Sequence, residues 1–358
     1  MIIYFFKKVT YGVFVLWGVL TLVFFLFNVL PGDPARMMLD KREDSNQLAI
    51  IKQKYAFDRS LVEQYALYLN DVSPFSIHNN TNTSFTYLKD GKYKFKRLFS
   101  FFDYTIVLKV PYLRESFVRT GTPVGIILMN TFKNTFVLAF TSIFFALLLG
   151  LVLGVFSALY KDSFIDKLIL FVSVLGMSLP SFFAAIIIAW FFGFVLHKYT
   201  GLNMIGSLYE VDDYGRGSFL QIKNLILPAI TLAIRPLSVI IQLCRNSLLE
   251  VLNTDYLRTA VAKGLGRFTV VFKHALRNAL NPVVTAVSGW FASMLAGAVF
   301  VEYIFAWNGL GKEIVDGLNT MDLPIVMGSV LFIASLFVII NILVDLIYGW
   351  IDPRIRVS

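Results

Sequence analysis

The hydrophobic residues of this chain gather into long unbroken runs instead of alternating with polar residues. A helix needs about 20 apolar residues to cross the hydrocarbon of a bilayer, and six runs satisfy this requirement. Five runs hold no charged residue, and the sixth, Leu225–Leu243, holds only Arg235. The pattern predicts an all-α integral membrane protein with six transmembrane helices. The uncharged runs are Val9–Leu30, Thr135–Leu159, Leu168–Leu196, Val283–Val301 and Ile325–Val344.

The runs divide the chain into three predicted parts. Residues 1–30 form a tail and the first transmembrane helix, residues 31–134 form a large loop, and residues 135–358 form a five-helix core. Within the large loop, "SLVEQYALYL" has the apolar spacing of a helix. The polar run "HNNTNTS" predicts a flexible tip. The basic run "KDGKYKFKRLF" predicts a strand or turn facing solvent or headgroups, with a docking surface for a partner as the alternative.

Composition agrees with a membrane protein. The chain is 57% hydrophobic and 15% charged, whereas about a quarter of the residues of a soluble domain are charged. Its net charge is +9. On a membrane chain, lysine and arginine collect on the cytoplasmic side, so this charge concerns topology and predicts no nucleic-acid partner. The single cysteine, Cys244, excludes a disulfide framework and predicts a buried or lipid-facing structural thiol.

The placement of basic residues predicts the topology. With the N-terminus inside, the inside segments hold twelve lysines and arginines and the two short outside loops hold four. The loop 31–134 holds fifteen, but loops longer than about 60 residues escape this rule. Both termini are therefore predicted to be cytoplasmic, and the loop 31–134 to be extracytoplasmic. Lys7 and Lys8 precede a run that is too long for a signal peptide, so we expect a retained span.

The sequence shows no catalytic constellation. It lacks H-E-x-x-H and G-x-S-x-G motifs and paired cysteine or histidine ligands. The segment "GLGK" resembles a phosphate loop faintly, but Glu313 stands where Ser or Thr is needed and Ala306 where the first Gly belongs. We therefore expect a chain that is not an enzyme and that holds no metal. If ATP is used, another chain binds it.

The apolar runs contain features that predict packing and a polar pathway. Gly150 and Gly154 form a G-x-x-x-G, which allows close helix approach within the chain. Prolines lie in or at the ends of spans, where freed carbonyls must find protein or water. Arg235 lies mid-span, where a charge must face the bundle interior and find a partner. It either lines the pathway and meets substrate carboxylates, or forms a structural pair or snorkels to the interface. The residues predicted to line the pathway are Pro180, Ser181, Arg235 and Pro236.

The basic loop 247–282 predicts two short amphipathic helices. Thr254 or Asp255 is placed to cap the first, and Gly264 and Gly266 break the pattern between the two. The basic, amphipathic pattern of the loop fits two interpretations equally. One is a hairpin lying on anionic headgroups, and the other is a docking element for a cytoplasmic subunit. The apolar faces are predicted from Leu257, Ala260, Val261 and Leu265 in the first helix and from Phe272, Ala275, Leu276, Ala279 and Leu280 in the second.

The sequence of the same loop resembles that of a known protein family. The run "SLLEVLNTDYLRTAVAKGLGRFTVVFKHALRNALNPVV" closely resembles permease subunits of the peptide/nickel class of ABC importers. "LPGDPAR", "SLPSFF", "LPAITLA", "VFVEYIFAWNGLGK" and "DPRIR" look like the same family, in the order and spacing of its B-type permease. The resemblance covers residues 1–70 and 113–358.

The resemblance implies a type I ABC importer permease fold in a bacterial cytoplasmic (inner) membrane. Such a permease pairs with a homologous permease, two cytoplasmic ATPases that bind ATP and Mg, and an extracytoplasmic substrate-binding protein. The chain itself would bind no cofactor and would contact membrane lipid. The residues implied to couple to the ATPase are Arg258, Thr259, Ala260, Lys263, Gly264, Leu265 and Arg267. The implied structural motif comprises Glu302, which would stabilise the external end of the fifth helix, with Gly309, Gly311, Asp352, Pro353 and Arg354.

The sequence departs from the family pattern in three places. Arg258, Thr259 and Ala260 stand where the general importer signature has Glu-Ala-Ala, a change that the peptide branch tolerates. Residues 73–112 have no family match and form a predicted insert that alters docking of the binding protein. Arg235 replaces a small or apolar residue, so its role does not follow from the family.

The leading hypothesis is an importer permease for di- or oligopeptides. The alternative within the family is a permease for nickel chelates or another small solute. A secondary transporter, the alternative from another class, usually needs intramembrane acids as coupling sites, and the charge-free spans argue against it.

Overall fold

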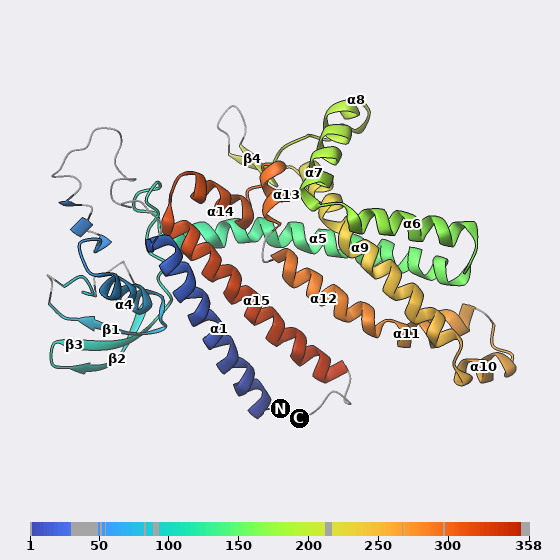
Figure 1. Cartoon of the computed structure of the whole chain (residues 1–358), viewed down its shortest axis with the longest axis horizontal. Coiled ribbons are helices and arrows are strands. Elements are labelled where there is room, and N and C mark those ends of the chain that lie inside the picture. Colours follow the sequence, from blue (N-terminus) through green and yellow to red (C-terminus); the bar gives the residue numbers. More distant parts are fainter. Residues whose placement is uncertain are drawn as a thin grey trace. The chain divides into compact units, whose positions relative to one another are not determined.

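The computed structural model describes residues 2–29, 49–50, 52–53, 55–81, 84–88, 93–211, 217–266, 268–295 and 298–351. The chain divides into two compact units. The first contains Met1–Val9, Thr131–Lys312 and Ile333–Ser358, and the second contains Thr10–Asn130 and Glu313–Phe332. Figure 1 colours the elements of both units along the sequence.

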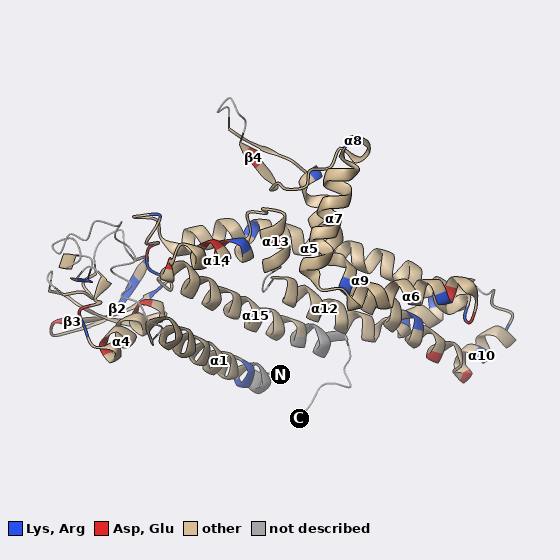
Figure 2. Ribbon diagram, turned by 45° about the horizontal axis from the view of Figure 1, so that its top comes forward, with Lys and Arg blue, Asp and Glu red and all other residues tan. Residues whose placement is uncertain are grey.

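Long apolar helices dominate the part of the chain that the structure describes. Four helices there are long and apolar enough to cross a membrane, or five if the bent pair described below counts as one span. Their ribbons carry few charged residues over most of their length (Figure 2). These helices are α1 (Ile2–Val29), α5 (Val124–Leu159), α9 (Lys223–Leu252) and α15 (Leu323–Ile351). The predicted count of six stays a prediction, because the run 283–301 corresponds to the shorter α12 (Asn281–Leu295) followed by α13 (Val299–Ile304).

The run Leu168–Leu196, predicted as one span, is divided by a sharp bend. Helix α6 (Phe164–Ser178) and helix α7 (Ser181–Trp190), continued by the π-helical segment η1 (Phe191–Val195), meet at an angle of 107°. Pro180 is the cause. A residue before proline is pushed out of the helical region, and Leu179 has φ −76° and ψ 128°. Pro180 then precedes the first turn of α7. The short helix α8 (His197–Thr200) follows.

Helices α5 and α6 pack closely against α9, and the approach of α5 is the one that the G-x-x-x-G motif predicts. A Cβ on Gly150 of α5 would lie 2.6 Å from a methyl carbon of Ile240, and one on Gly154 would lie 2.7 Å from Cβ of Cys244. On α6, Gly176 approaches the Ser238 hydroxyl in the same way. The motif therefore packs helices within the chain. Cys244 is buried there, as predicted.

A buried ion pair joins α6 to α9. The Arg245 guanidinium donates from Nε to Asp166 Oδ1 at 2.8 Å and from Nη2 to Oδ2 at 2.7 Å. The Ser157 hydroxyl donates to the same carboxylate. Bidentate pairs of this kind fix orientation as well as add energy. The pair anchors the segment of α9 that leads into the basic loop.

The second unit contains a sheet, which corrects the prediction of an all-α protein. Helix α4 (Leu61–Val72) begins at a capping box formed by Ser60 and Glu63 and confirms the helix predicted from "SLVEQYALYL". Strands β1 (Phe75–Asn79), β2 (Phe95–Phe101) and β3 (Tyr104–Lys109) form an antiparallel sheet in the order β1-β3-β2. The predicted flexible tip is wrong at its start, because His78 and Asn79 belong to β1.

Hydrogen bonds join the two ends of residues 71–112, which we call the sheet segment. The backbone amide of Tyr112 donates to the Asp71 carbonyl at 2.9 Å. The Asp71 side chain accepts from Arg114 Nε at 3.0 Å and from the Tyr93 hydroxyl at 3.2 Å. The chain thus leaves α4 and returns to it at one point.

The remaining elements are short. Strands β4 (Tyr209–Val211) and β5 (Ser218–Leu220) pair in a small antiparallel sheet. The helices are α10 (Asp255–Ala262), the π-helical η2 (Thr269–Ala275), α11 (Leu276–Ala279) and α14 (Leu310–Asn319). Helix α5 begins at Val124, so the loop predicted to end at residue 134 ends earlier.

Candidate functional site

The basic loop folds into two short helical pieces, as predicted. Helix α10 ends at Ala262, and η2 begins at Thr269 and runs directly into α11. Gly264 makes the break with a φ of +83°, in the left-handed region that glycine adopts without a Cβ penalty. Gly266 lies outside that region. Thr254 occupies the N-cap of α10, but its hydroxyl donates back to the Val251 carbonyl at 2.5 Å, so the predicted side-chain cap is absent.

The predicted apolar faces of the loop are correct only in part. Leu257 is buried and Ala260 half-buried, but Val261 and Leu265 are exposed. In the second piece Ala275 and Ala279 are buried, Leu276 and Leu280 are half-buried, and Phe272 is exposed. At Phe272 the reason is the π-helical hydrogen bonding of η2, which changes the helical period on which the prediction relied, and Leu265 lies beyond the end of α10. Segment η2 buries Val270 and Val271 instead.

The exposed side of the loop carries apolar and basic side chains together. The Phe268 and Phe272 rings stack with centroids 4.4 Å apart, and Phe268 is 74% exposed. We call Val261, Leu265, Phe268 and Phe272 the loop surface. Among the residues implied to couple to an ATPase, Arg258, Thr259, Lys263, Gly264 and Leu265 are exposed, and Ala260 is half-buried. Arg267 lies outside the described residues.

The other side of the loop is buried against α9 and α12. Leu257, Val270, Val271, Ala275 and Ala279 join one cluster with Ile240, Cys244 and Leu248 of α9 and Val283 of α12. Side chains in such a cluster are close-packed and transmit strain. The loop is therefore packed firmly on these two helices.

Arg235 lines a cavity of about 260 Å³ in the first unit. Its guanidinium has no hydrogen bond or ion pair to any residue that the structure describes. The structure agrees with the prediction that Arg235 faces the interior of the helix bundle. The partner expected for its charge is not among the described residues. Other lining residues come from α7, α9, α12 and α13, and are Ser181, Thr231, Leu232, Trp290, Ser293, Met294 and Phe300, among others.

Two prolines shape this cavity without lining it. Pro236 lies inside α9, where it provides no amide for the carbonyl of Leu232, four residues before it. Leu232 itself lines the cavity. Pro180 is the N-cap of α7 and immediately precedes Ser181, another lining residue. Of the four predicted pathway residues, Ser181 and Arg235 therefore line this cavity, and Pro180 and Pro236 are only their chain neighbours.

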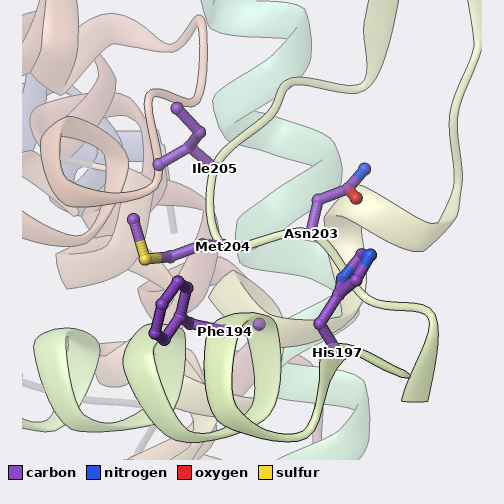
Figure 3. A pocket seen from close by; sticks show the side chains of 6 residues that line it. Phe194, His197, Asn203, Met204 and Ile205 are labelled. Atoms are coloured by element: carbon purple, nitrogen blue, oxygen red, sulfur yellow. The ribbon is translucent and has the colours of Figure 1, made fainter. Parts of the chain in front are cut away.

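A second hollow, of about 450 Å³, was not foreseen from the sequence. It is lined by Gly193, Phe194, His197, Asn203, Met204 and Ile205. Figure 3 shows Phe194 and Met204 at one end and His197 and Asn203 at the other. Its only titratable side chain is His197, whose Nδ1 lies 2.6 Å from the Leu202 carbonyl. Among the described residues, no three His, Cys, Asp or Glu side chains gather as metal ligands do.

The buried Glu302 carboxylate accepts hydrogen bonds from the start of α14. Its Oε2 accepts from the amides of Gly311 at 2.6 Å and Lys312 at 3.3 Å, and its Oε1 accepts from the Thr135 hydroxyl at 2.7 Å. The carboxylate therefore satisfies free amides at a helix N-terminus. Burial raises the pKa of Glu302, and the three donors oppose that rise.

The close packing around the Glu302 carboxylate requires glycine at positions 309 and 311. A Cβ on Gly309 would overlap the Glu302 carboxyl group, and one on Gly311 would lie 2.5 Å from Cα of Val299. The motif implied by resemblance thus has a packing reason at these three residues. Its other members, Asp352, Pro353 and Arg354, lie outside the described residues.

Comparison with known proteins gives consistent matches along the chain. The model of the family described as binding-protein-dependent transport system inner membrane component matches residues 150–357, and the model of its N-terminal region matches residues 1–84. The dipeptide transport system permease protein DppB of Alkalihalophilus pseudofirmus is 31% identical, over 99% of this chain and 100% of its own length. The di/tripeptide transport system permease protein DppB of Pseudomonas aeruginosa is 32% identical, over 95% and 94%. Among solved structures, an inward-facing form of the MetNI methionine ABC transporter covers 64% of this chain and 97% of its own, with 18% identity and a TM-score of 0.49.

Proposed function

Since the chain belongs to the family of binding-protein-dependent transport system inner membrane components, we propose that it is the permease subunit of an ATP-driven importer of dipeptides or short oligopeptides. The observation that carries this proposal is the match to dipeptide permeases along nearly the full length of both chains. The protein is a multi-pass inner-membrane protein. It assembles with a second permease, two cytoplasmic ATPases that bind ATP and Mg, and an extracytoplasmic binding protein, and both of its termini are cytoplasmic.

The loop surface is the contact for an ATPase. Its aromatic and aliphatic side chains are exposed although the loop has a buried face of its own, and basic residues surround them. Exposed apolar side chains with a charged rim are typical of a protein interface. The break at Gly264 lets α10 and η2 present their exposed side chains together.

The buried side of the loop transmits motion to the cavity. Arg235 and the end of α9 at Leu252 are 17 residues apart on one helix, a length of about 26 Å at about 1.5 Å per residue. The loop is packed on that helix and on α12, and both helices contribute residues to the Arg235 cavity. A displacement of the loop by the ATPase therefore changes the shape of this cavity.

Arg235 is the binding group for a substrate carboxylate. Every unmodified peptide has a C-terminal carboxylate, which arginine binds through charge-assisted hydrogen bonds. A charge at membrane depth is expensive unless it serves such a role. The Arg235 guanidinium, which has no partner among the described residues, lines the same cavity as Ser181 and Ser293 and provides the donor set with them.

Replacing Arg235 with glutamine is expected to lower uptake of peptides with a free C-terminal carboxylate by about tenfold, the value of one charge-assisted bond of about 1.5 kcal/mol. Uptake of the matching C-terminal amides is expected to change little. The measurement is initial uptake of each labelled peptide into proteoliposomes. Arg235→Lys, which keeps the charge, should retain more carboxylate uptake than Arg235→Gln. Equal losses for acids and amides would show that Arg235 is structural.

The proposed function itself is tested by co-purification and reconstitution. The chain is expected to isolate with a second permease and two ATPases, and the complex to hydrolyse ATP faster when the binding protein and a dipeptide are added. Dipeptide should then accumulate in proteoliposomes only with ATP on the ATPase side. Uptake by the isolated chain without ATP would refute the proposal, and stimulation by nickel chelates instead of peptides would assign another substrate.

A further inference from the structure

The sheet of the second unit has an unusual distribution of polar and apolar side chains. Along β3 the residues alternate, with Thr105, Val107 and Lys109 buried and the residues between them exposed. The buried face is largely polar. The Lys109 ammonium lies 4.4 Å from the centre of the Tyr93 ring, and buried His78 bonds the Thr86 carbonyl through Nδ1 at 2.8 Å.

The opposite face of the sheet is apolar and exposed. Residues directly opposite in an antiparallel pair point to the same side, and the register aligns three rows across the strands. We call this side the outer face. Its apolar members are between 39% and 73% exposed, so no described element covers them. The rows are Phe75, Leu108 and Lys96; Ile77, Ile106 and Phe99; and Asn79, Tyr104 and Phe101.

An outer face of this kind indicates a binding surface. Leaving a Phe or Ile side chain in water instead of burying it costs about 1.5–3 kcal/mol. Soluble monomers rarely expose contiguous apolar patches larger than a few hundred Å². Seven apolar side chains lie on the outer face, and Phe102 in the adjoining turn is 87% exposed. A partner that removes them from water is therefore needed.

The support of the sheet points to lipid as that partner. Tyr68 of α4 packs against Leu20, Val23 and Phe24 of α1, within the candidate span Phe6–Asn28. Leu20 is eight residues from the end of that span, about 12 Å along the helix. Asn70 of α4 then holds the edge of β1 through two hydrogen bonds to Ile77, of 2.8 and 2.9 Å. The sheet is thus attached, through α4, to the candidate membrane span of α1 (Figure 1).

The charge of the sheet is complementary to anionic headgroups. Lys96 of β2 is exposed on the outer face, Lys94 just before β2 is also exposed, and none of the three strands contains an acid. Asp103 lies in the turn between β2 and β3. Aromatic side chains with neighbouring basic residues are the composition of membrane-interface segments.

We propose that the outer face of the sheet β1-β3-β2 binds the surface of the lipid bilayer. The aromatic side chains lie at the boundary between headgroups and acyl chains, and Lys96 of β2 binds anionic headgroups. This association with lipid keeps the sheet at the membrane surface and requires no other protein chain. It does not depend on the identity of the transported solute.

The test measures the lipid exposure of a spin label in the full transporter complex in nanodiscs containing phosphatidylglycerol. Phe99→Cys places the label on the outer face and Ser100→Cys places it one residue along on the opposite face, both with Cys244 replaced by serine. We expect a several-fold higher ratio of collisions with oxygen to collisions with a water-soluble nickel complex at position 99. Phe14→Cys on α1 provides the lipid-facing reference, and Phe101→Cys repeats the outer-face measurement.

Further results decide the matter. Lys96→Glu is expected to move the label at 99 toward water in phosphatidylglycerol discs, and much less in discs of phosphatidylcholine alone. Equal accessibility at 99 and 100 in lipid would overturn the proposal. Shielding at 99 that arises only after the binding protein is added would identify a protein as the occupant instead.

Discussion

Substituting valine for Gly264 is expected to abolish most solute uptake while leaving the protein in the membrane and the ATPases active. A β-branched residue at a φ of +83° is strained by about 1–3 kcal/mol. The loop then relaxes to another backbone conformation and no longer presents the loop surface as α10 and η2 now hold it. A cost of that size reduces the population of the present conformation by roughly tenfold to a hundredfold. Uptake per ATP hydrolysed, measured in proteoliposomes, reports the loss.

Two variants control this experiment. A Cβ at Gly264 or at Gly266 meets no atom within 4 Å, but only Gly264 has a left-handed φ. Gly266→Val is therefore expected to retain most of the uptake. Gly264→Asn should also retain more uptake than Gly264→Val, because asparagine tolerates the left-handed region. Undiminished uptake by Gly264→Val would show that the loop does not transmit the ATPase motion.

Replacing Glu302 with alanine is expected to be the most destabilising change considered. It leaves the amides of Gly311 and Lys312 and the Thr135 hydroxyl without the carboxylate that accepts from them. Each buried donor that loses its acceptor costs about 1–3 kcal/mol, so the total for three donors is about 3–9 kcal/mol. We expect a fall of about 10 °C in the thermal midpoint of the purified complex, and much less permease in the membrane.

The control for Glu302 is an acid that makes no such contacts. Glu250 is exposed near the end of α9, and Glu250→Gln should shift the midpoint by no more than about 1 °C. Glu302→Gln keeps one acceptor oxygen and is expected to fall between the wild type and Glu302→Ala. A wild-type midpoint for Glu302→Ala would show that water replaces the carboxylate at no cost.

The long helices of this protein were predictable because each is a run of apolar residues. The ends of the helices were not. Helix α5 starts eleven residues before Thr135, since its first turns contain Asn130 and Lys133, and the apolar criterion stops at such residues although the backbone hydrogen bonding does not. The bend at Pro180 was visible as a proline, but the 107° angle depends on how α7 packs after the break.

Parts of the candidate site were predicted and parts were missed for identifiable reasons. The glycine break at Gly264 follows from sequence because only backbone chemistry is involved. The exposure of Val261, Leu265 and Phe272 does not follow, since the ordinary helical period placed them on buried faces. Of the sheet, β2 agrees with the strand or turn predicted from "KDGKYKFKRLF". Strands β1 and β3 were missed because polar residues such as Ser76, His78 and Thr105 are buried while their apolar neighbours are exposed. That reverses the usual distribution of polar and apolar side chains.

The hydrogen-bonded ends of the sheet segment have a consequence for engineering the protein. Because the Tyr112 amide bonds the Asp71 carbonyl, the two ends of the roughly forty residues between them lie side by side. A segment whose ends meet can be shortened or extended without displacing the elements on either side. The same position is a natural site for attaching a tag or a reporter domain.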